Sequence, residues 1–145
     1  MQTVVYIPGA PVGKGRPRVA VQGGHAHAYT PQRTRDYEWL VQQCFAAQKC
    51  AVMPRGEALS VTVEAVCPVP ESATKKQRAE MLAGRTLPTK KPDADNVLKI
   101  ILDALNGVAY EDDRQIVALA IRKTYGEKPG VRVEIRTIAS EEENE

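Results

Sequence analysis

The chain has 145 residues, of which 43% are apolar and 26% are charged, and this balance favours one soluble folded domain. It excludes a disordered chain, a collagen-like repeat and a dense disulfide scaffold, and no apolar run is long enough to span a membrane. The net charge is only +2. The N-terminus lacks the features of a secretory signal, and the three cysteines lack the spacing of a zinc ribbon. We therefore expect a cytoplasmic protein with reduced thiols.

The first third of the chain is predicted to form a strand, a hairpin and a helix. Residues 3–7 are rich in β-branched side chains and end at a Pro-Gly pair, as a strand does. Residues 18–21 and 25–29 flank two glycines and predict a hairpin. Apolar side chains then recur with helical spacing over residues 31–49, after Thr30, which is a candidate N-cap.

The remainder is predicted to alternate strands and helices. Residues 59–65 alternate apolar and polar side chains, residues 73–83 read as a short polar helix, and residues 93–106 read as a second amphipathic helix. Residues 115–125 are apolar on both faces, which favours a central strand, and residues 131–136 predict a final strand with one face in water. The expected fold is α+β: a single compact domain in which a mixed β-sheet packs against two main helices.

The densest chemical signal is a D-x-D pair followed later by a D-D pair. Asp93 and Asp95 can face one cation, because side chains two residues apart point the same way in extended geometry. Carboxylates with no His or Cys nearby favour Mg²⁺ or Mn²⁺ over zinc. Lys99 follows Asp95 by one helical turn, and Asp112 and Asp113 can return beside the helix start. Such a set suits metal-assisted phosphodiester hydrolysis.

Two structural interpretations remain open for these residues. Aspartate at a helix start is favoured by capping and by the helix dipole alone, and Asp95, Lys99 and Asp103 can form a ladder of surface ion pairs. A calcium loop of the EF-hand type is excluded, because its sixth position needs glycine and counting from Asp93 places Leu98 there.

Positive charge is concentrated in the first part of the chain. Residues 1–91 hold 13 Lys and Arg against 6 Asp and Glu, whereas residues 92–145 hold 7 against 12. Basic side chains on the glycine-containing loop at residues 13–18 can approach phosphates closely. Together with a separate carboxylate cluster, this favours a nucleic-acid enzyme over a merely solvated basic loop. The predicted DNA contacts are Lys14, Arg16, Arg18, Arg33, Arg35, Lys90 and Lys91.

The stretch PDADNVLKIILDALNGVAYEDDRQI resembles the signature of the RusA-type Holliday-junction resolvases, P-D-x-D-N-x-x-K…D-A-L…D-D-x-Q-I. The stretches IPGAPVGKGRPRV and AYTPQRTRDYE are similar to the N-terminal part of phage- and prophage-borne members. The resemblance extends from about residue 6 to residue 136. It implies a RusA-like endonuclease domain over residues 1–138, with residues 139–145 as an acidic C-terminal tail.

The resemblance also implies residue roles and a reaction. Asp93, Asp95 and Asp113 match the metal-binding catalytic aspartates of the family, Lys99 matches its catalytic lysine, and Asp112 is a further candidate metal ligand. Members of the family are homodimers that require Mg²⁺, for which Mn²⁺ is a conceivable substitute, and that nick a four-way junction symmetrically. The expected function is therefore a structure-selective endodeoxyribonuclease that resolves Holliday junctions in DNA recombination and repair.

Two other functions stay open at this point. One is a non-catalytic DNA-junction-binding protein whose aspartates are structural caps, and the other is a nuclease for other branched DNA. A metal site at His25 and His27 is disfavoured, because no third ligand is evident. With aromatic residues at 5%, a platform of stacked bases is not the leading mode of binding.

Overall fold

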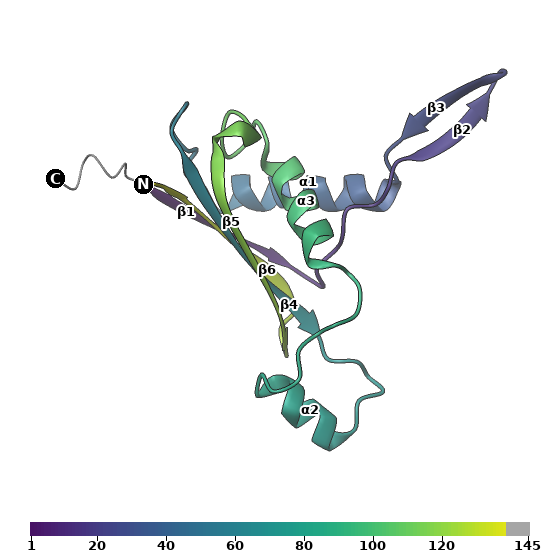
Figure 1. The fold of residues 1–145 in the computed structure, drawn as a ribbon, viewed down its shortest axis with the longest axis vertical. Coiled ribbons are helices and arrows are strands. Elements are labelled where there is room, and N and C mark those ends of the chain that lie inside the picture. Colours follow the sequence, from purple (N-terminus) through teal and green to yellow (C-terminus); the bar gives the residue numbers. More distant parts are fainter. Residues whose placement is uncertain (139–145) are drawn as a thin grey trace.

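A computed structural model describes residues 1–138, so the predicted acidic tail at residues 139–145 lies outside the described residues. A four-stranded mixed sheet forms the centre of the molecule (Figure 1). Its spatial order is β1-β6-β4-β5, and the bounds of its strands are β1 Gln2–Pro8, β4 Leu59–Pro68, β5 Ile116–Gly126 and β6 Gly130–Thr137.

The sheet pairs the first described strand with the last. β1 runs antiparallel to β6, with Gln2 opposite Arg136 and Pro8 opposite Gly130. β6 runs antiparallel to β4, whereas β4 and β5 are parallel. A parallel pair needs a long crossover connection, and here that connection carries the helices α2 (Lys75–Leu82) and α3 (Ala94–Leu105).

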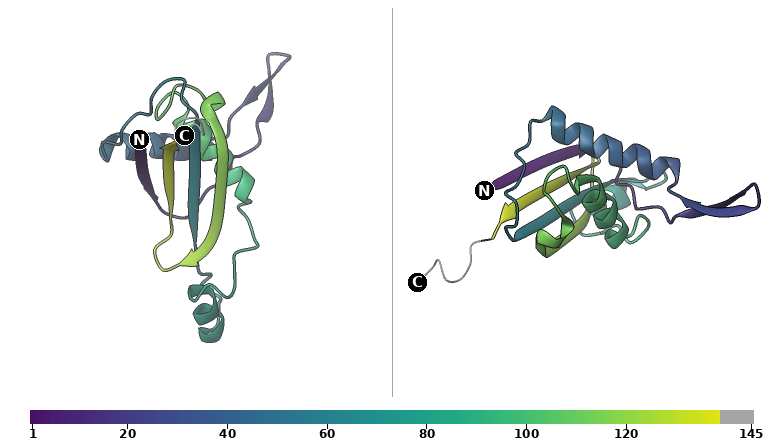
Figure 2. Two further views of the ribbon diagram at one scale, coloured as in Figure 1. Left: turned by 60° about the vertical axis from the view of Figure 1, so that its left-hand side comes forward. Right: turned by 90° about the horizontal axis from the view of Figure 1, so that it is seen from above.

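Two helices cover one face of the sheet, as predicted (Figure 2). They are α1 (Gln32–Ala47) and α3, and their apolar stripes meet the alternate side chains of the strands, including Val61 and Val63, which are 0% exposed. Burial of such side chains contributes roughly 1.5–3 kcal/mol each. The α+β fold with a mixed sheet and two main helices is therefore confirmed.

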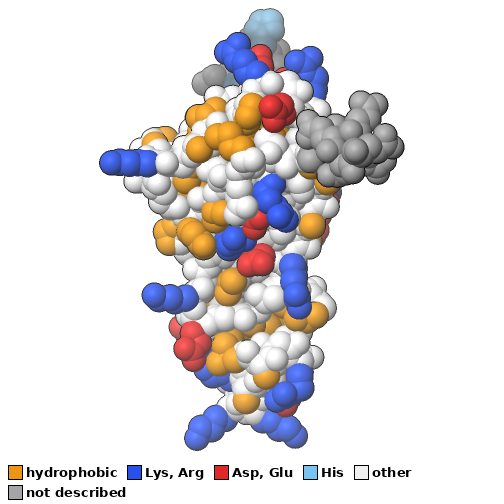
Figure 3. All heavy atoms as spheres, turned by 90° about the vertical axis from the view of Figure 1, so that its left-hand side faces the viewer, with side chains coloured by type: hydrophobic (Ala, Val, Ile, Leu, Met, Phe, Trp, Pro, Cys, Tyr) orange, Lys and Arg blue, Asp and Glu red, His pale blue; other side chains and the backbone are white. Residues whose placement is uncertain are grey.

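The open face of the sheet carries side chains of every kind. Figure 3 shows hydrophobic, positive and negative side chains interspersed on this face. Arg132 and Glu134 form an ion pair there, with 3.0 Å between the guanidinium and the carboxylate oxygen. Since this face has no uniform charge, the basic surface expected to meet DNA has to be sought on the side of the helices.

One prediction about the sheet was wrong. The apolar segment at residues 115–125 was expected to be central, but β5 is an edge strand, and Val117 and Leu119 are 65% and 50% exposed. Apolar side chains on both faces are typical of a central strand. The pattern alone, however, does not show whether other strands or helices cover those faces. The two central strands, β4 and β6, instead alternate buried and half-buried side chains.

Two elements extend beyond the sheet and its covering helices (Figure 1). The predicted hairpin is present as β2 (Arg18–Gln22) and β3 (His25–Tyr29), which pair with each other in a separate two-stranded sheet. The polar helix α2 lies at the opposite end and is capped by Thr74. In residues 1–138, no helix has the length and hydropathy needed to cross a membrane.

The start of α1 also differs from the prediction. The helix begins at Gln32, so Pro31 takes the N-cap position and Thr30 does not. Pro31 makes no side-chain cap, and its carbonyl oxygen instead accepts hydrogen bonds from the backbone N–H groups of Thr34 and Arg35. The hydroxyl of Thr34 accepts a hydrogen bond from the basic loop, as described below.

Candidate active site

The first turn of α3 presents two exposed carboxylates. Asp93 takes the N-cap position with extended backbone, but its side chain makes no capping hydrogen bond. Asp95 follows in the first turn and is also exposed. Capping therefore does not account for Asp93, and both carboxylates remain available to a ligand.

The basic loop at residues 9–17 is seated between the starts of α1 and α3. The backbone N–H of Lys14 donates to the carbonyl oxygen of Asn96 at 2.8 Å, and that of Gly15 donates to the hydroxyl of Thr34 at 3.1 Å. A Cβ atom on Gly15 would lie 2.7 Å from that hydroxyl oxygen, and one on Gly13 would lie 3.2 Å from the Cβ of Asn96. The two glycines thus permit a close approach that larger residues would prevent.

Around this loop the surface is hollowed by three adjoining pockets, which we call the loop groove. One pocket is lined by Arg16, Asp93, Asp95 and Lys99, so the groove brings the predicted metal ligands, the predicted catalytic lysine and a predicted DNA contact together. The other two pockets add Arg18, Arg33 and Lys91 to the lining. Most of the side chains that the sequence singled out therefore share one groove. Its full lining consists of Pro11, Gly13, Lys14, Gly15, Arg16, Pro17, Arg18, Pro31, Arg33, Thr34, Lys91, Pro92, Asp93, Asp95, Asn96, Lys99 and Asp103.

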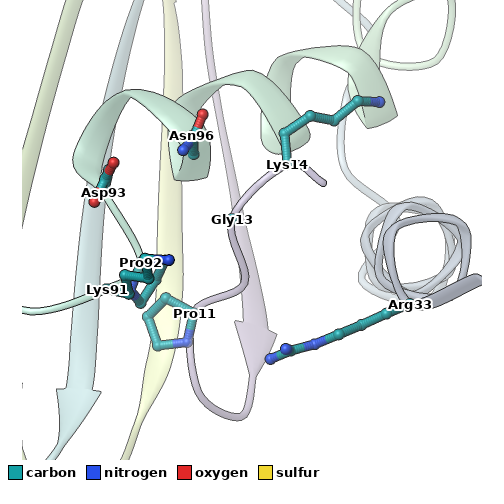
Figure 4. Close-up of a pocket in the computed structure, with 8 residues that line it drawn as sticks. All are labelled: Pro11, Gly13, Lys14, Arg33, Lys91, Pro92, Asp93 and Asn96. Carbon is teal, nitrogen blue, oxygen red and sulfur yellow. The ribbon is translucent and has the colours of Figure 1, made fainter. Parts of the chain in front are cut away.

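Lys14 is directed away from the carboxylates of the first turn. Figure 4 shows its side chain running along α3 toward the later turns, whereas Arg33 extends from α1 toward the loop. The Nζ atom of Lys14 lies 2.6 Å from a carboxylate oxygen of Glu38 on α1 and 3.1 Å from one of Asp103 on α3. Partial burial lowers the pKa of Lys14, but the hydrogen bonds to these carboxylates and their negative charge outweigh it and raise the pKa above its usual value. Lys14 thus joins the loop to both helices.

The ladder of ion pairs along α3 is not formed. Asp103 pairs with Lys14, and no ion pair of Lys99 is present in the described part of the chain. Lys99 is exposed beside Asp95 at the floor of the loop groove. Its ammonium group is therefore free to meet an anionic ligand.

Asp112 and Asp113 have different surroundings. Asp112 caps the short turn Asp113–Gln115 by accepting a hydrogen bond from the backbone N–H of Arg114, so the structural interpretation holds for this residue. A carboxylate oxygen of Asp113 lies 2.8 Å from the hydroxyl of Tyr110, which also lies 2.9 Å from the carbonyl oxygen of Leu102. Asp113 is thus linked to the second half of α3 through the hydroxyl of Tyr110.

Tyr110 is a buried hydrogen-bond donor. It is 1% exposed, and burial followed by the hydrogen bond to Asp113 and its charge raises the pKa of Tyr110 far above the usual value. The carbonyl oxygen of Leu102 already accepts from the backbone N–H of Asn106 at 2.9 Å. The one hydroxyl proton of Tyr110 is therefore free to serve Asp113, which needs a donor more than Leu102 does.

The oxygen donors at the start of α3 suit a hard cation in type, since Asp93, Asp95 and Asn96 supply carboxylate and amide oxygens. Within the part of the chain that the structure describes, however, no three His, Cys, Asp or Glu side chains are grouped to hold a metal ion. α3 rises about 1.5 Å per residue, so Leu102, whose carbonyl oxygen contacts Tyr110, is about 10 Å along the helix from Asp95. Asp93 and Asp95 thus fit Mg²⁺ that is bound by one or two carboxylates, water and substrate phosphates.

Two predicted DNA contacts lie outside the loop groove. Arg35 is exposed on α1 and donates a hydrogen bond to Gln32, and Lys90 is exposed in the segment before α3, where its carbonyl oxygen accepts from Lys123 at 2.9 Å. Both remain on the surface, and neither lines the pockets that hold Asp93 and Lys99.

Comparison with known proteins agrees with these features. The family model described as "Endodeoxyribonuclease RusA" matches residues 8–136. The chain belongs to the RusA family. The resemblance noted in the sequence is thereby confirmed, and membership of the RusA family implies endodeoxyribonuclease activity. A relative from Bacillus subtilis (strain 168), described as "Uncharacterized protein YqaN", is 34% identical over 134 residues, which cover 91% of this chain and 94% of the relative.

Sequence reasoning missed the residues that position the basic loop in the loop groove. Glu38, Thr34 and Asp103 carry no motif that predicts a contact with the loop, because their contacts join segments far apart in the chain. Asn96 belongs to the acidic motif, but its contact with the loop is made by the backbone and leaves no signal in the sequence. Of the aromatic residues, Tyr37 and Tyr110 are buried and cannot stack on bases, whereas Tyr29 and Trp39 are exposed.

Proposed function

We propose that this RusA-family protein is a Mg²⁺-dependent, structure-selective endodeoxyribonuclease that resolves Holliday junctions by paired symmetric nicks in DNA recombination and repair. The observation that carries the proposal is the shared groove, in which Asp93, Asp95 and Lys99 lie beside the basic loop. The three cysteines are free thiols, which supports the cytoplasm as its location.

Each predicted catalytic or metal-binding residue has a proposed role. Asp93 and Asp95 hold Mg²⁺, for which Mn²⁺ can substitute, and the bound cation supplies neutralisation of the charge that develops on the scissile phosphate. Lys99 donates a hydrogen bond to the phosphate or to the leaving oxygen. Asp113 is the third proposed catalytic aspartate, held in one orientation by Tyr110. Asp112 is assigned to the cap of its own turn instead.

DNA is held by the rim of the groove. Arg16, Arg18, Arg33 and Lys91 line it, and we propose that these side chains bind the phosphates on either side of the cleaved bond. Their exposure leaves them free to reach the DNA backbone. Lys14 is the exception, because its ammonium is already paired with Glu38 and Asp103.

Two symmetric cuts need two active sites, and we propose a homodimer with two-fold symmetry. The exposed edge of β5 is the proposed contact surface. Val117 and Leu119 present apolar side chains along an edge whose backbone groups are free to pair. Joining two such edges would extend the sheet through both copies.

The test is a cleavage assay on a synthetic four-way junction, with linear duplex and flap DNA as controls, in the presence and absence of Mg²⁺. We expect paired nicks in the junction with Mg²⁺ and little cleavage of the duplex. Asp95→Asn and Asp113→Asn are expected to abolish cleavage while junction binding persists, since the loss of negative charge does not weaken attraction to phosphate. Lys99→Ala is expected to lower the rate by about 100-fold or more, like the loss of one oxyanion donor.

The matched control is Asp36→Asn, which removes a carboxylate from the exposed face of α1, outside the loop groove. Cleavage by this variant should equal that of the wild type. Faster cleavage of the flap than of the junction would favour a nuclease for other branched DNA. Junction binding with no cleavage in Mg²⁺ or Mn²⁺ would instead establish a non-catalytic binding protein.

A further inference from the structure

The β2–β3 hairpin extends from the domain as an uncovered two-stranded ribbon (Figures 1 and 2). Within residues 1–138 its strands pair with each other and with no other strand. Val19 and Val21 are 69% and 73% exposed. An isolated hairpin is marginally stable in water, so a ribbon of this kind gains stability from a ligand that lies against it.

The ribbon has one polar and one apolar face. Residues opposite each other in an antiparallel pair share a face, and side chains alternate along each strand. Arg18 stands opposite Tyr29, and Gln22 stands opposite His25, with the pair of Ala20 and His27 between them on the same face. Hydrogen-bond donors therefore line one face over the whole ribbon. The other face carries only Val19, Val21, Ala26 and Ala28.

The polar face continues the basic lining of the loop groove. Arg18 belongs to both, since it is the first residue of β2 and also lines a pocket with Arg16 and Arg33. Residues 1–35 contain no Asp or Glu at all. The basic residues in the same stretch are Lys14, Arg16, Arg18, Arg33 and Arg35. A segment without any negative charge that leads out of a basic groove is complementary to a polyanion.

We propose that the β2–β3 hairpin is a DNA-binding arm, whose polar face lies along the phosphates of the duplex arm next to the cleavage groove. This inference rests on the proposed function, because it takes branched DNA as the ligand. Five residues at about 3.3 Å each give the ribbon a reach of about 17 Å, or about five base pairs of duplex at about 3.4 Å each. A two-stranded ribbon also has the width to enter the major groove.

A second copy of the chain is the less favoured occupant. A stable protein interface buries roughly 800 Å² on each partner, and the apolar face of the ribbon offers two valines and two alanines. The edge strand β5 exposes Val117 and Leu119 and is already the proposed contact between copies. A copy that covered the apolar face would leave the donors of the polar face in water and would give them no role.

The test compares three variants of the full chain in junction binding without Mg²⁺ and in footprinting. The first replaces residues 19–28 with Asn-Gly, so that a tight turn closes on the Arg18–Tyr29 pair. The second, Gln22→Ala with His25→Ala and His27→Ala, removes donors from the polar face and keeps the ribbon. The third, Val19→Thr with Val21→Thr, changes the apolar face at nearly constant shape and is the matched control.

We expect the first two variants to raise the Kd for the junction by about 10-fold and to shorten the protected region by about five base pairs on an arm. The control should keep the wild-type Kd and footprint. Wild-type values for both the hairpin replacement and the polar-face variant would overturn the arm. So would a loss of dimer mass in the control variant, which would assign the ribbon to a second copy. Failure of the wild type to bind the junction would overturn the proposed function itself.

Discussion

Tyr37 and Tyr110 are two buried tyrosines whose hydroxyl groups meet opposite surroundings. The hydroxyl of Tyr110 contacts Asp113, whereas the buried hydroxyl of Tyr37 has no hydrogen-bond partner in the described part of the chain. A buried hydroxyl without a partner costs free energy that a hydrogen bond would otherwise recover. The pair therefore offers a matched test of what one hydrogen bond contributes at the site.

Tyr110→Phe is expected to lower the free energy of unfolding by about 1.5–3 kcal/mol, because it removes a hydrogen bond to a charged group. Tyr37→Phe is expected to leave the stability unchanged or slightly higher. Urea denaturation of both variants checks this. Equal losses in the two variants would show that the contact between Tyr110 and Asp113 contributes nothing measurable.

The same two residues predict a response to alkaline pH. Burial raises the pKa of both hydroxyls far above the usual value. The charge of Cys44 raises the pKa of Tyr37 further, and the hydrogen bond to Asp113 and its charge raise that of Tyr110 further. The folded state thus favours the neutral hydroxyl, so this stabilisation is present below the unfolded pKa of about 10 and is lost as the pH rises beyond it. Absorbance at 295 nm should show two tyrosines that ionise only when the protein unfolds. Smooth ionisation of every tyrosine in the folded protein would contradict the burial.

Lys14 and Arg16 are neighbours on the loop, but only Lys14 is held by carboxylates. We expect Arg16→Ala to reduce the salt dependence of junction binding by about 0.9 in log–log slope, as one lost phosphate contact does. Lys14→Met should change the slope less and should instead lower the stability by about 1 kcal/mol, since Glu38 and Asp103 lose their partner. Binding measured over a range of salt concentrations, with urea denaturation, separates the two. A full slope change in Lys14→Met would show that its ammonium leaves the carboxylates for DNA.

At the scale of elements, the sequence predicted which segments become helices and strands better than it predicted their neighbours. The periodic patterns of α1, α3 and β4 depend on which face is buried, so the chain itself records them. The edge position of β5 depends on which strands lie beside it, and its two-faced apolar pattern does not record that.

In the candidate site too, local spacing predicted some features, and contacts between distant segments determine the others. Asp93, Asp95 and Lys99 belong to one helical stretch, and their spacing placed them together correctly. The seat of the basic loop against α3 joins Lys14 to Asn96 through the backbone, and the position of Asp113 depends on the hydroxyl of Tyr110. Both features arise from long-range packing, which local patterns do not contain.

At the scale of the whole molecule, the β2–β3 hairpin and the β5 edge are both left uncovered within residues 1–138. For the β5 edge, Val117→Lys with Leu119→Lys is expected to convert the proposed dimer to monomers, because lysines on an edge oppose strand pairing. Analytical ultracentrifugation checks the mass, and the cleavage products should change from paired nicks to single nicks.

The matched control for the β5 edge is Val52→Lys, which adds a charge at a residue that is 59% exposed and lies outside the sheet. It should leave the dimer intact. A dimer that survives both lysines on β5 would place the contact between copies on another surface.

The pairing of β1 with β6 determines when the protein can finish folding during its synthesis. Among the described residues, β1 pairs only with β6, at residues 130–136, and the basic loop donates a backbone hydrogen bond to the carbonyl oxygen of Asn96. Contacts this far apart in sequence form slowly and late. A nascent chain that still holds its last strand inside the ribosome has neither a finished sheet nor a finished groove. We therefore expect that a nascent chain ending before residue 130 does not cut DNA, because it lacks the strand that pairs with β1.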